Sequence, residues 1–245
     1  MCQICGNTLH QPALTRRDFL AASTVAAFGA LAFGSAFAAD PPKPGTPPPN
    51  AIAPAEALKR LMEGNARYAA NTPSERDFSS GRAARATAQY PFASILSCAD
   101  ARVAPELLFD QAPGELFVVR VAGNIVTNSL LASLEYGVQF LGVPMSLVLG
   151  HSACGAVDAA IKVAKSKAVL PGHLPELVGA IKPAVAAAEK MPGGVTLDNA
   201  IVANVRGQVA RLKAATPIVQ KAYKDKKIEI AGGVYDIGTG KVTLI

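Results

Sequence analysis

The sequence predicts an α/β fold in which a mainly parallel central β-sheet is flanked by helices and gains an antiparallel C-terminal edge strand. Apolar runs of strand length alternate with amphipathic segments of helical period over most of the chain, and this alternation is typical of parallel sheets. The chain closes with two short apolar runs on either side of Gly238-Thr239-Gly240. A turn of this kind predicts a hairpin, and therefore an antiparallel edge.

The first half of the domain begins with a helix over 55–70, in which Leu58, Leu61 and Met62 form one apolar stripe. No element is assigned to the polar, Ser- and Arg-rich stretch that follows. The next expected elements are a strand at 92–97, a short helix at 104–110, a buried strand at 115–120 and a helix at 129–141, where Leu130, Leu134 and Val138 recur at helical spacing.

The second half starts with an apolar strand at 145–150 and a helix from about residue 153. Pro171 and Pro175 interrupt the chain, and helices are expected at 176–190 and 197–224. The last helix carries Ile201, Val205 and Val209 on one side. Strands at 227–231, 234–236 and 241–245 complete the sheet. No internal repeat is present, and the length suits one domain with a sizeable core.

Residues 1–38 are predicted to be a twin-arginine export signal outside the folded domain. Arg16-Arg17 precedes a moderately apolar, Ala- and Gly-rich run, and Ala36-Phe37-Ala38 is a small-x-small cleavage site. An uncleaved membrane anchor is the alternative, but the run lacks a strongly apolar core of about 20 residues. Cleavage would leave a periplasmic or otherwise exported protein without stable membrane insertion. Residues 39–54 are proline-rich and predict an extended linker, which leaves 55–245 as the domain.

The charge distribution argues against a nucleic-acid partner. The formal net charge of +6 is spread along the chain, and its densest cluster is Lys221, Lys224, Lys226 and Lys227. These lysines lie near the end of a predicted helix, where cations suit the carbonyl end. Because no arginine-rich run or interleaved aromatic residues accompany them, we expect a solvated helix end.

Two short motifs carry the expected chemistry. Cys98-x-Asp100-x-Arg102 follows the predicted strand 92–97, and Gly150-His151-Ser152-Ala153-Cys154-Gly155 ends the strand 145–150. Because ligands bind at the carboxyl ends of parallel strands, the two motifs are expected to converge. Two thiolates and one imidazole, from Cys98, His151 and Cys154, are ligands that Zn²⁺ prefers, and three protein ligands leave a fourth position free for chemistry.

The two motifs together resemble the β-class carbonic anhydrases, and the resemblance extends from the first helix to the closing hairpin. It includes Phe117-Val118-Val119-Arg120 and Gly123-Asn124. The family implies a zinc lyase, with one Zn²⁺ per subunit, that converts carbon dioxide and water into bicarbonate and a proton by means of zinc-bound hydroxide. It also implies a homodimer or tetramer whose sites lie near the subunit interface, with N-terminal helices packed over the neighbouring subunit.

Asp100 and Arg102 are the expected catalytic residues. In carbonic anhydrases with three histidine ligands, zinc lowers the pKa of bound water from about 15.7 to near 7, and two thiolates should raise that value somewhat. The Asp100 carboxylate would accept a hydrogen bond from the hydroxide and so direct its lone pair, while Arg102 fixes the carboxylate. Asp100 is also a candidate fourth zinc ligand in a shut, inactive state.

The resemblance also implies a set of substrate-binding residues. Gln89 matches a glutamine that hydrogen-bonds the substrate across the dimer interface, Phe117 and Tyr136 match the apolar wall around carbon dioxide, and Gly155 matches a glycine whose amide faces the substrate. On their own, Gln89 reads as a surface residue and the two aromatic residues as core. His173 is interpreted as a loop residue, with a proton shuttle as the weaker alternative.

Several rival interpretations remain open at this stage. Cys98 and Cys154 could form a disulfide in an oxidising compartment. The run Gly150 to Cys154 imitates the nucleophile elbow of α/β-hydrolases, with Ser152 as nucleophile, but it has cysteine where that turn needs glycine. The zinc site could instead hydrolyse carbonyl sulfide or carbon disulfide, or it could hold zinc or sense redox state without turnover. Asp100 and Arg102 argue against the last, because a purely structural site has no hydroxide to orient.

Overall fold

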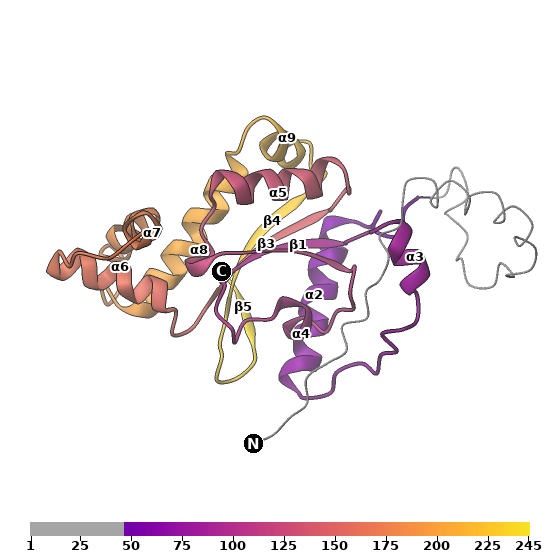
Figure 1. Cartoon of the computed structure of the whole chain (residues 1–245), viewed down its shortest axis with the longest axis horizontal. Coiled ribbons are helices and arrows are strands. Elements are labelled where there is room, and N and C mark those ends of the chain that lie inside the picture. The colour runs from indigo at the N-terminus through magenta and orange to yellow at the C-terminus, as the bar shows by residue number, and fades with distance from the viewer. Residues whose placement is uncertain (1–46) are drawn as a thin grey trace, which may run out of the picture. The chain divides into compact units, whose positions relative to one another are not determined.

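The computed structural model describes residues 47–245, and it confirms the predicted α/β architecture. Five strands form one sheet in the order β2-β1-β3-β4-β5 (Figure 1). Four of them, β1 (Ala93–Ser97), β2 (Leu116–Arg120), β3 (Met145–His151) and β4 (Glu229–Tyr235), run parallel. The last, β5 (Val242–Leu244), pairs antiparallel with β4. The expected antiparallel C-terminal edge is therefore present. The predicted signal at 1–38 lies outside the described residues.

Helices cover both faces of the sheet. The helices are α2 (Pro54–Ala69), α3 (Arg82–Thr87), α4 (Pro105–Leu108), α5 (Asn128–Gln139), α6 (Gly155–Ser166), α7 (Leu174–Ala188), α8 (Leu197–Lys213) and α9 (Ile218–Lys224), with a short 3₁₀ turn, η2 (Ala122–Asn124). Helices α2 and α4 lie on one side of the strands and α5 and α9 on the other (Figure 1). Among the described residues, no helix combines the length and apolar character needed to cross a membrane.

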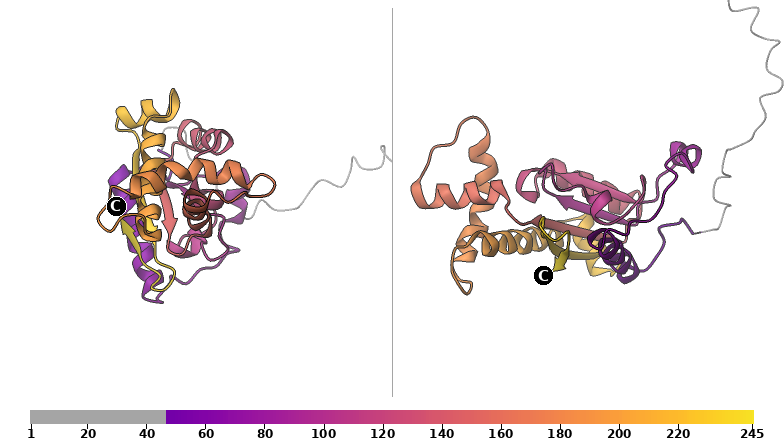
Figure 2. Two further views of the ribbon diagram at one scale, coloured as in Figure 1. Left: turned by 90° about the vertical axis from the view of Figure 1, so that its left-hand side faces the viewer. Right: turned by 90° about the horizontal axis from the view of Figure 1, so that it is seen from below.

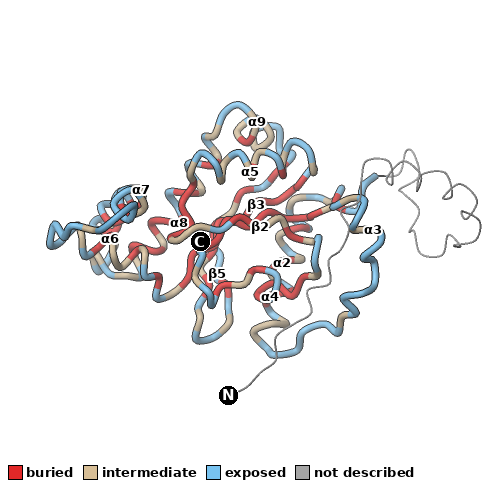
Figure 3. The backbone as a smooth tube through the Cα atoms, viewed as in Figure 1, coloured by how far each residue is buried: buried red, intermediate tan, exposed pale blue. Residues whose placement is uncertain are grey.

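The core is divided between the two faces of the central strands. Ile95 and Leu147 pack with α2 on one face, whereas their neighbours Leu96 and Val148 pack with α5, α8 and α9 on the other. Every residue of β1 and β3 is buried, and Figure 3 shows this buried backbone running through the middle of the domain. Strands covered on both faces favour apolar side chains at most positions, which explains why the sequence shows apolar runs here without alternation.

Helices α6 and α7 pack on α8 beyond one end of the sheet (Figure 2). Their apolar side chains form a separate cluster, which includes Ile161, Ile181 and Ile201. Cys98 and Cys154 are buried in the same cluster. The carboxyl ends of β1 and β3 are thus covered by this helical layer, which closes off the metal-ligand motifs from that side.

Two predictions for the C-terminal part of the domain were wrong. The helix expected at 197–224 is two helices, because it is interrupted at Pro217, where the ring removes the backbone donor. The strands expected at 227–231 and 234–236 are one strand, β4, which continues through Gly232 and Gly233. A Cβ atom on Gly232 would lie 2.7 Å from Val205 Cγ1 of α8. The glycine is therefore a close-packing position and does not mark a turn.

The N-terminal part of the domain begins with α2, which packs on the sheet of its own chain, with Ala57 and Leu61 fully buried. The unassigned stretch contains α3, which buries no residue. The described end of the predicted linker is anchored, since the buried Asn50 side chain donates to Pro91 O at 3.0 Å and to Leu141 O at 2.7 Å.

Asn65 joins the beginning and the end of the domain. Its Nδ2 on α2 donates to Gly240 O at 2.9 Å and to Leu108 O at 3.0 Å, and its Oδ1 accepts from Val242 N at 2.8 Å. The side chain is buried, so these three hydrogen bonds satisfy it where water is excluded. One residue thereby ties α2 to the closing hairpin.

Candidate metal centre

The two motifs converge as expected. Strands β1 and β3 are parallel neighbours, with Ser97 paired to Leu149, so the loops that follow them leave the sheet side by side. Cys98 follows β1 and His151 ends β3. Ala153 has a left-handed backbone with φ of 55°, a conformation unusual for alanine. The turn at Ala153 places Cys154 next to His151 and Cys98. The ligand atoms of Cys98, His151 and Cys154 all lie within 4.8 Å of one another.

The imidazole of His151 presents a free nitrogen to the two sulfur atoms. His151 is fully buried, and its Nδ1 lies 2.9 Å from Ser152 O. A carbonyl accepts only from a protonated nitrogen, so Nδ1 carries the proton and Nε2 keeps its lone pair. Nε2 is buried without a hydrogen-bond partner. A buried polar atom of this kind is costly unless a ligand satisfies it, and a metal ion among the three donors would do so.

The charges of the cluster favour a cation. The interaction between the two neighbouring thiols lowers the pKa of Cys98 and raises the pKa of Cys154, because one sulfur ionises readily while the other keeps its proton. Burial lowers the pKa of His151, but the interaction with the neighbouring Cys98 outweighs burial and raises it overall. Displacement of these protons needs a positive charge in their place. The donor set fits Zn²⁺.

Asp100 and Arg102 form a bidentate pair at the edge of the cluster. Arg102 Nε donates to Asp100 Oδ1 at 2.9 Å and Arg102 Nη2 donates to Oδ2 at 2.7 Å. This guanidinium holds the pKa of Asp100 well below its usual range. Asp100 Oδ2 lies 4.0 Å from His151 Nε2, so the carboxylate borders the metal position while both its oxygens are engaged by Arg102.

Two further residues support the ligands, and the sequence analysis gave them no role. Arg120 donates from Nε to Cys98 O at 3.0 Å and from Nη2 to Asp100 O at 2.7 Å, which fixes the backbone of the first motif. Gly123 N donates to Cys98 Sγ at 3.2 Å. The position of Arg120 in the sequence could have indicated its role, because it is a charged residue at the carboxyl end of an otherwise apolar strand beside β1.

Gly155 occupies the expected place next to the ligands. It is the first residue of α6, directly after Cys154, and a Cβ atom built on it would meet nothing within 4 Å. The side-chain position of Gly155 is therefore open. The positive end of a helix dipole also favours negative charge at this point.

Gln89, Phe117 and Tyr136 are not brought to the ligands within one subunit. Gln89 is exposed and precedes β1, whereas Cys98 follows it. Phe117 pairs with Ser94 near the amino end of β1, and its ring centroid lies 6.3 Å from that of Tyr136 on α5. The two aromatic residues thus meet each other, with Tyr136 47% exposed, toward the opposite ends of the strands from the cysteines.

Two alternatives from the sequence lose support. Cys98 and Cys154 are free thiols, so the disulfide is absent. Ser152 is held in the structure: its Oγ accepts from Ile237 N at 3.0 Å and its N donates to Tyr235 O at 2.9 Å. The hydroxyl anchors the loop after β4 and is not a nucleophile. His173 is the exposed residue before α7, in a groove with Val121 and Ile125.

Comparison with known proteins identifies relatives for most of the chain. The family model described as carbonic anhydrase matches residues 93–242. The chain is 36% identical over 192 residues to carbonic anhydrase 2 of Mycobacterium tuberculosis, an alignment that covers 78% of this chain and 92% of the relative. A carbonic anhydrase of Pseudomonas aeruginosa is 38% identical over 169 residues, covering 64% of this chain and 74% of the relative.

Solved structures show the same fold. A Coccomyxa β-carbonic anhydrase in complex with acetazolamide aligns with a TM-score of 0.60 and 31% identity, covering 77% of this chain and 86% of the other. One of two tetrameric β-carbonic anhydrases from Sordaria macrospora aligns with a TM-score of 0.60 and 24% identity, covering 78% and 97%. At 24% identity, the similarity to the Sordaria macrospora structure shows the fold alone.

A parallel sheet whose adjacent strand ends present buried cysteine and histidine ligands beside an arginine-held carboxylate is the architecture of a metal-dependent lyase. The family model and the sequence relatives, which match most of the chain, identify the family. The chain belongs to the carbonic anhydrase family, and its fold is that of the β class.

Proposed function

We propose that this chain hydrates carbon dioxide reversibly to bicarbonate and a proton, using one Zn²⁺ per subunit held by Cys98, His151 and Cys154. The observation that carries the proposal is the buried group of three ligand atoms within 4.8 Å of one another, next to the Asp100–Arg102 pair. When bound, zinc would supply a Lewis acid that makes hydroxide available from water near neutral pH.

Asp100 orients the attacking hydroxide. Its carboxylate is ionised, because Arg102 keeps its pKa low, and it can therefore act only as a hydrogen-bond acceptor. A hydroxide that donates its hydrogen to Asp100 points a lone pair toward the carbon of the substrate. Arg102 engages both carboxylate oxygens, and this keeps Asp100 beside the ligands and off the metal position.

Gly155 and the start of α6 stabilise the charge that develops on the substrate. As carbon dioxide is attacked, one of its oxygens becomes negative. Because α6 begins at Gly155, directly after Cys154, the amide of Gly155 would donate to that oxygen, and no side chain at Gly155 would obstruct its approach. Such donors are oriented before the reaction and need no rearrangement during it.

A complete substrate pocket needs a second subunit. Gln89, Phe117 and Tyr136 lie toward the amino ends of the strands, so in a homodimer or tetramer they would reach the ligands of a neighbour and supply a hydrogen-bond donor and an apolar wall. Exposed Tyr136 and Phe140, with centroids 5.3 Å apart, give this surface an apolar character suited to association.

The proposal is tested with two variants assayed for metal content and for carbon dioxide hydration by stopped flow. Cys154→Ala removes a ligand and is expected to lose both zinc and activity. Asp100→Ala is expected to keep zinc and to lose most turnover, because the ligands remain while the orienting acceptor is gone. Full hydration activity in metal-free protein would contradict the zinc role. The same assay with carbonyl sulfide or carbon disulfide decides whether carbon dioxide is the preferred substrate.

We also infer that residues 1–38 direct export through the twin-arginine route. This route carries folded proteins, so the metal could be inserted before transport and the two thiolates would reach an oxidising compartment protected by zinc. Replacement of Arg16 and Arg17 by lysine should retain the full-length protein in the cytoplasm, as fractionation and the size of the product would show. Unchanged export of this variant would contradict the inference.

A further inference from the structure

The backbone of Gly123 links the metal-ligand loop to the helical layer behind it. On one side its N–H donates to Cys98 Sγ at 3.2 Å. On the other side its carbonyl oxygen accepts from Asn204 Nδ2 of α8 at 2.8 Å. Gly123 has a left-handed backbone with φ of 72°, which glycine adopts without steric cost. The N–H and the carbonyl belong to the two peptide groups on either side of the Gly123 Cα, and rotation about the glycine backbone is easy. The orientation of the N–H therefore depends on the contacts that fix the neighbouring peptide group.

Asn204 is itself fixed by a second amide. Gln208 Nε2 donates to Asn204 Oδ1 at 3.2 Å, and Gln208 Oε1 accepts from Val126 N at 2.9 Å. The two side chains are 1% and 7% exposed, so each hydrogen bond forms where water cannot replace it. The η2 turn at Gly123, and the chain just after it at Val126, are thus hydrogen-bonded to neighbouring turns of α8.

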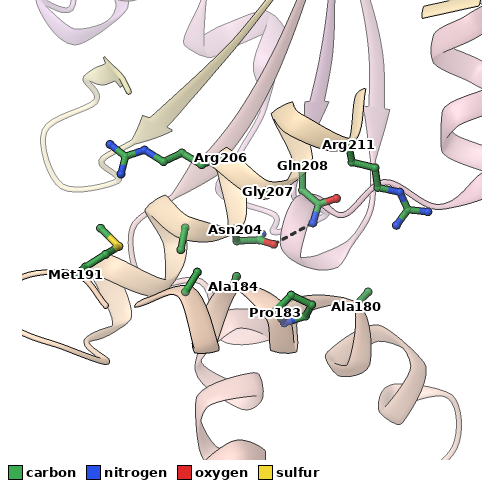
Figure 4. A pocket seen from close by; sticks show the side chains of 11 residues that line it. Ala180, Pro183, Ala184, Met191, Asn204, Arg206, Gly207, Gln208 and Arg211 are labelled. Carbon is green, nitrogen blue, oxygen red and sulfur yellow. Dashed lines mark hydrogen bonds between the residues drawn. The ribbon is translucent and has the colours of Figure 1, made fainter. Parts of the chain in front are cut away.

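Helix α7 closes this support from the opposite side. A Cβ atom on Gly123 would lie 2.6 Å from Ile181 Cδ1 of α7, so the turn is packed tightly and cannot shift toward that helix. Figure 4 shows Asn204 and Gln208 joined at a groove of about 580 Å³ between α7 and α8, while Arg206 and Arg211 extend away from each other at its ends. The two amides are the polar groups that connect this layer to η2.

We propose that Asn204 and Gln208 are positioning residues for the metal ligand Cys98 and act through the backbone of Gly123. They fix the N–H that holds Sγ, and thereby set both the direction of the thiolate and the share of its charge that reaches the metal. Hydrogen bonds that orient a metal-binding residue affect both the affinity for the metal and the geometry of the ligand. The inference rests on the zinc site proposed above.

The test compares zinc affinity and a cobalt spectrum among variants of the full chain. Asn204→Leu removes the donor to Gly123 at similar volume, and Gln208→Met removes the second amide. Asn199→Leu is the matched control: Asn199 lies on the same helix and donates to Pro192 O and Gly194 O at 2.9 and 2.8 Å, away from η2. Zinc dissociation constants come from chelator competition, and the Co²⁺-substituted proteins report sulfur-to-metal charge transfer.

We expect Asn204→Leu to weaken zinc binding about 10- to 100-fold and to change the sulfur-to-cobalt absorption, with a smaller effect for Gln208→Met and none for Asn199→Leu. If Asn204→Leu does not fold, Asn204→Ser, whose hydroxyl is too short to reach Gly123 O, takes its place. Loss of thermal stability with native zinc affinity and a native cobalt spectrum would overturn the positioning role alone. Failure of the native chain to bind zinc would overturn the proposed function with it.

Discussion

At the scale of single residues, the pairing of Asp100 with Arg102 depends on the shape of the guanidinium as well as its charge. Two nitrogens of Arg102 reach two oxygens of Asp100, and only a planar fork makes both bonds at once. The Arg102 side chain is 52% exposed, so the pair adds little to stability. Its contribution is to the direction of the carboxylate.

Arg102→Lys should therefore lower turnover with little change in stability. A lysine ammonium can contact one carboxylate oxygen and leaves the other free to swing toward the metal position. We expect kcat/KM for carbon dioxide hydration to fall about tenfold or more, equivalent to about 1.4 kcal/mol of transition-state stabilisation, while zinc content and thermal midpoint remain native. A variant with native kcat/KM would show that the fork is dispensable.

Arg120 provides a second prediction at this scale. It holds the carbonyl groups of Cys98 and Asp100, so its loss frees the backbone that carries both a ligand and the orienting acid. Arg120→Lys should weaken zinc binding and reduce turnover together, unlike Arg102→Lys. Chelator competition and stopped-flow hydration on the same samples separate the two variants. Native zinc affinity in Arg120→Lys would remove Arg120 from the support of the site.

The ligands could be predicted from sequence, whereas their supports could not. Cys98, His151 and Cys154 combine distinctive chemistry with motifs placed after two strands. Gly123 and Asn204 carry no such mark: a glycine in a loop and an asparagine in a helix have many ordinary roles. What makes them significant is their proximity to Cys98 in space, which depends on how α8 crosses the sheet.

At the scale of elements, Asp110 secures the segment that follows α2. Its side chain is 5% exposed and pairs with Arg67 and Arg76, at 2.6 and 2.8 Å, and with Ser74 Oγ at 2.7 Å. The residue follows α4, whereas its partners belong to α2 and the stretch after it. This one carboxylate holds three separate parts of the N-terminal region together.

Asp110→Asn should destabilise the domain by about 2 kcal/mol, measured by urea unfolding at neutral pH. Burial alone would raise the pKa of Asp110, but hydrogen bonds from Arg67 and Ser74 outweigh it and lower the pKa below the ordinary value. The unfolded chain therefore takes up the proton first as pH falls, so this contribution is present above about pH 4 and is lost below it. The difference between native and variant should stay constant from neutral pH down to about pH 5 and shrink below about pH 4. A difference independent of pH would contradict the role of the charge.

Most elements followed from periodicity, and the exceptions have definite causes. Helix α8 ends before Pro217, whose effect the apolar stripe of 197–224 concealed. In β4, Gly232 and Gly233 resemble a break, yet α8 crosses the strand so closely that Val205 leaves no room for a side chain on Gly232. Both exceptions reflect tertiary packing, which local pattern does not contain.

At the scale of the whole molecule, function should depend on pairing of subunits. If Gln89 serves the neighbour's site, mixed subunits carrying Gln89→Ala and Cys154→Ala will complement each other. In a random mixture half of the dimers are mixed and each has one intact site, so about a quarter of native activity should appear. Each variant refolded alone is the control and should stay nearly inactive. Absence of recovery in mixtures shown to contain mixed dimers would place Gln89 in its own subunit's site.

The hydrogen bonds of Asn65 have a consequence for biosynthesis. This side chain on α2 needs Gly240 and Val242, which lie 175 and 177 positions further along the chain. Until both residues have left the ribosome, α2 lacks these partners and the nascent domain stays open. Native closure of the domain therefore waits for the closing hairpin to emerge.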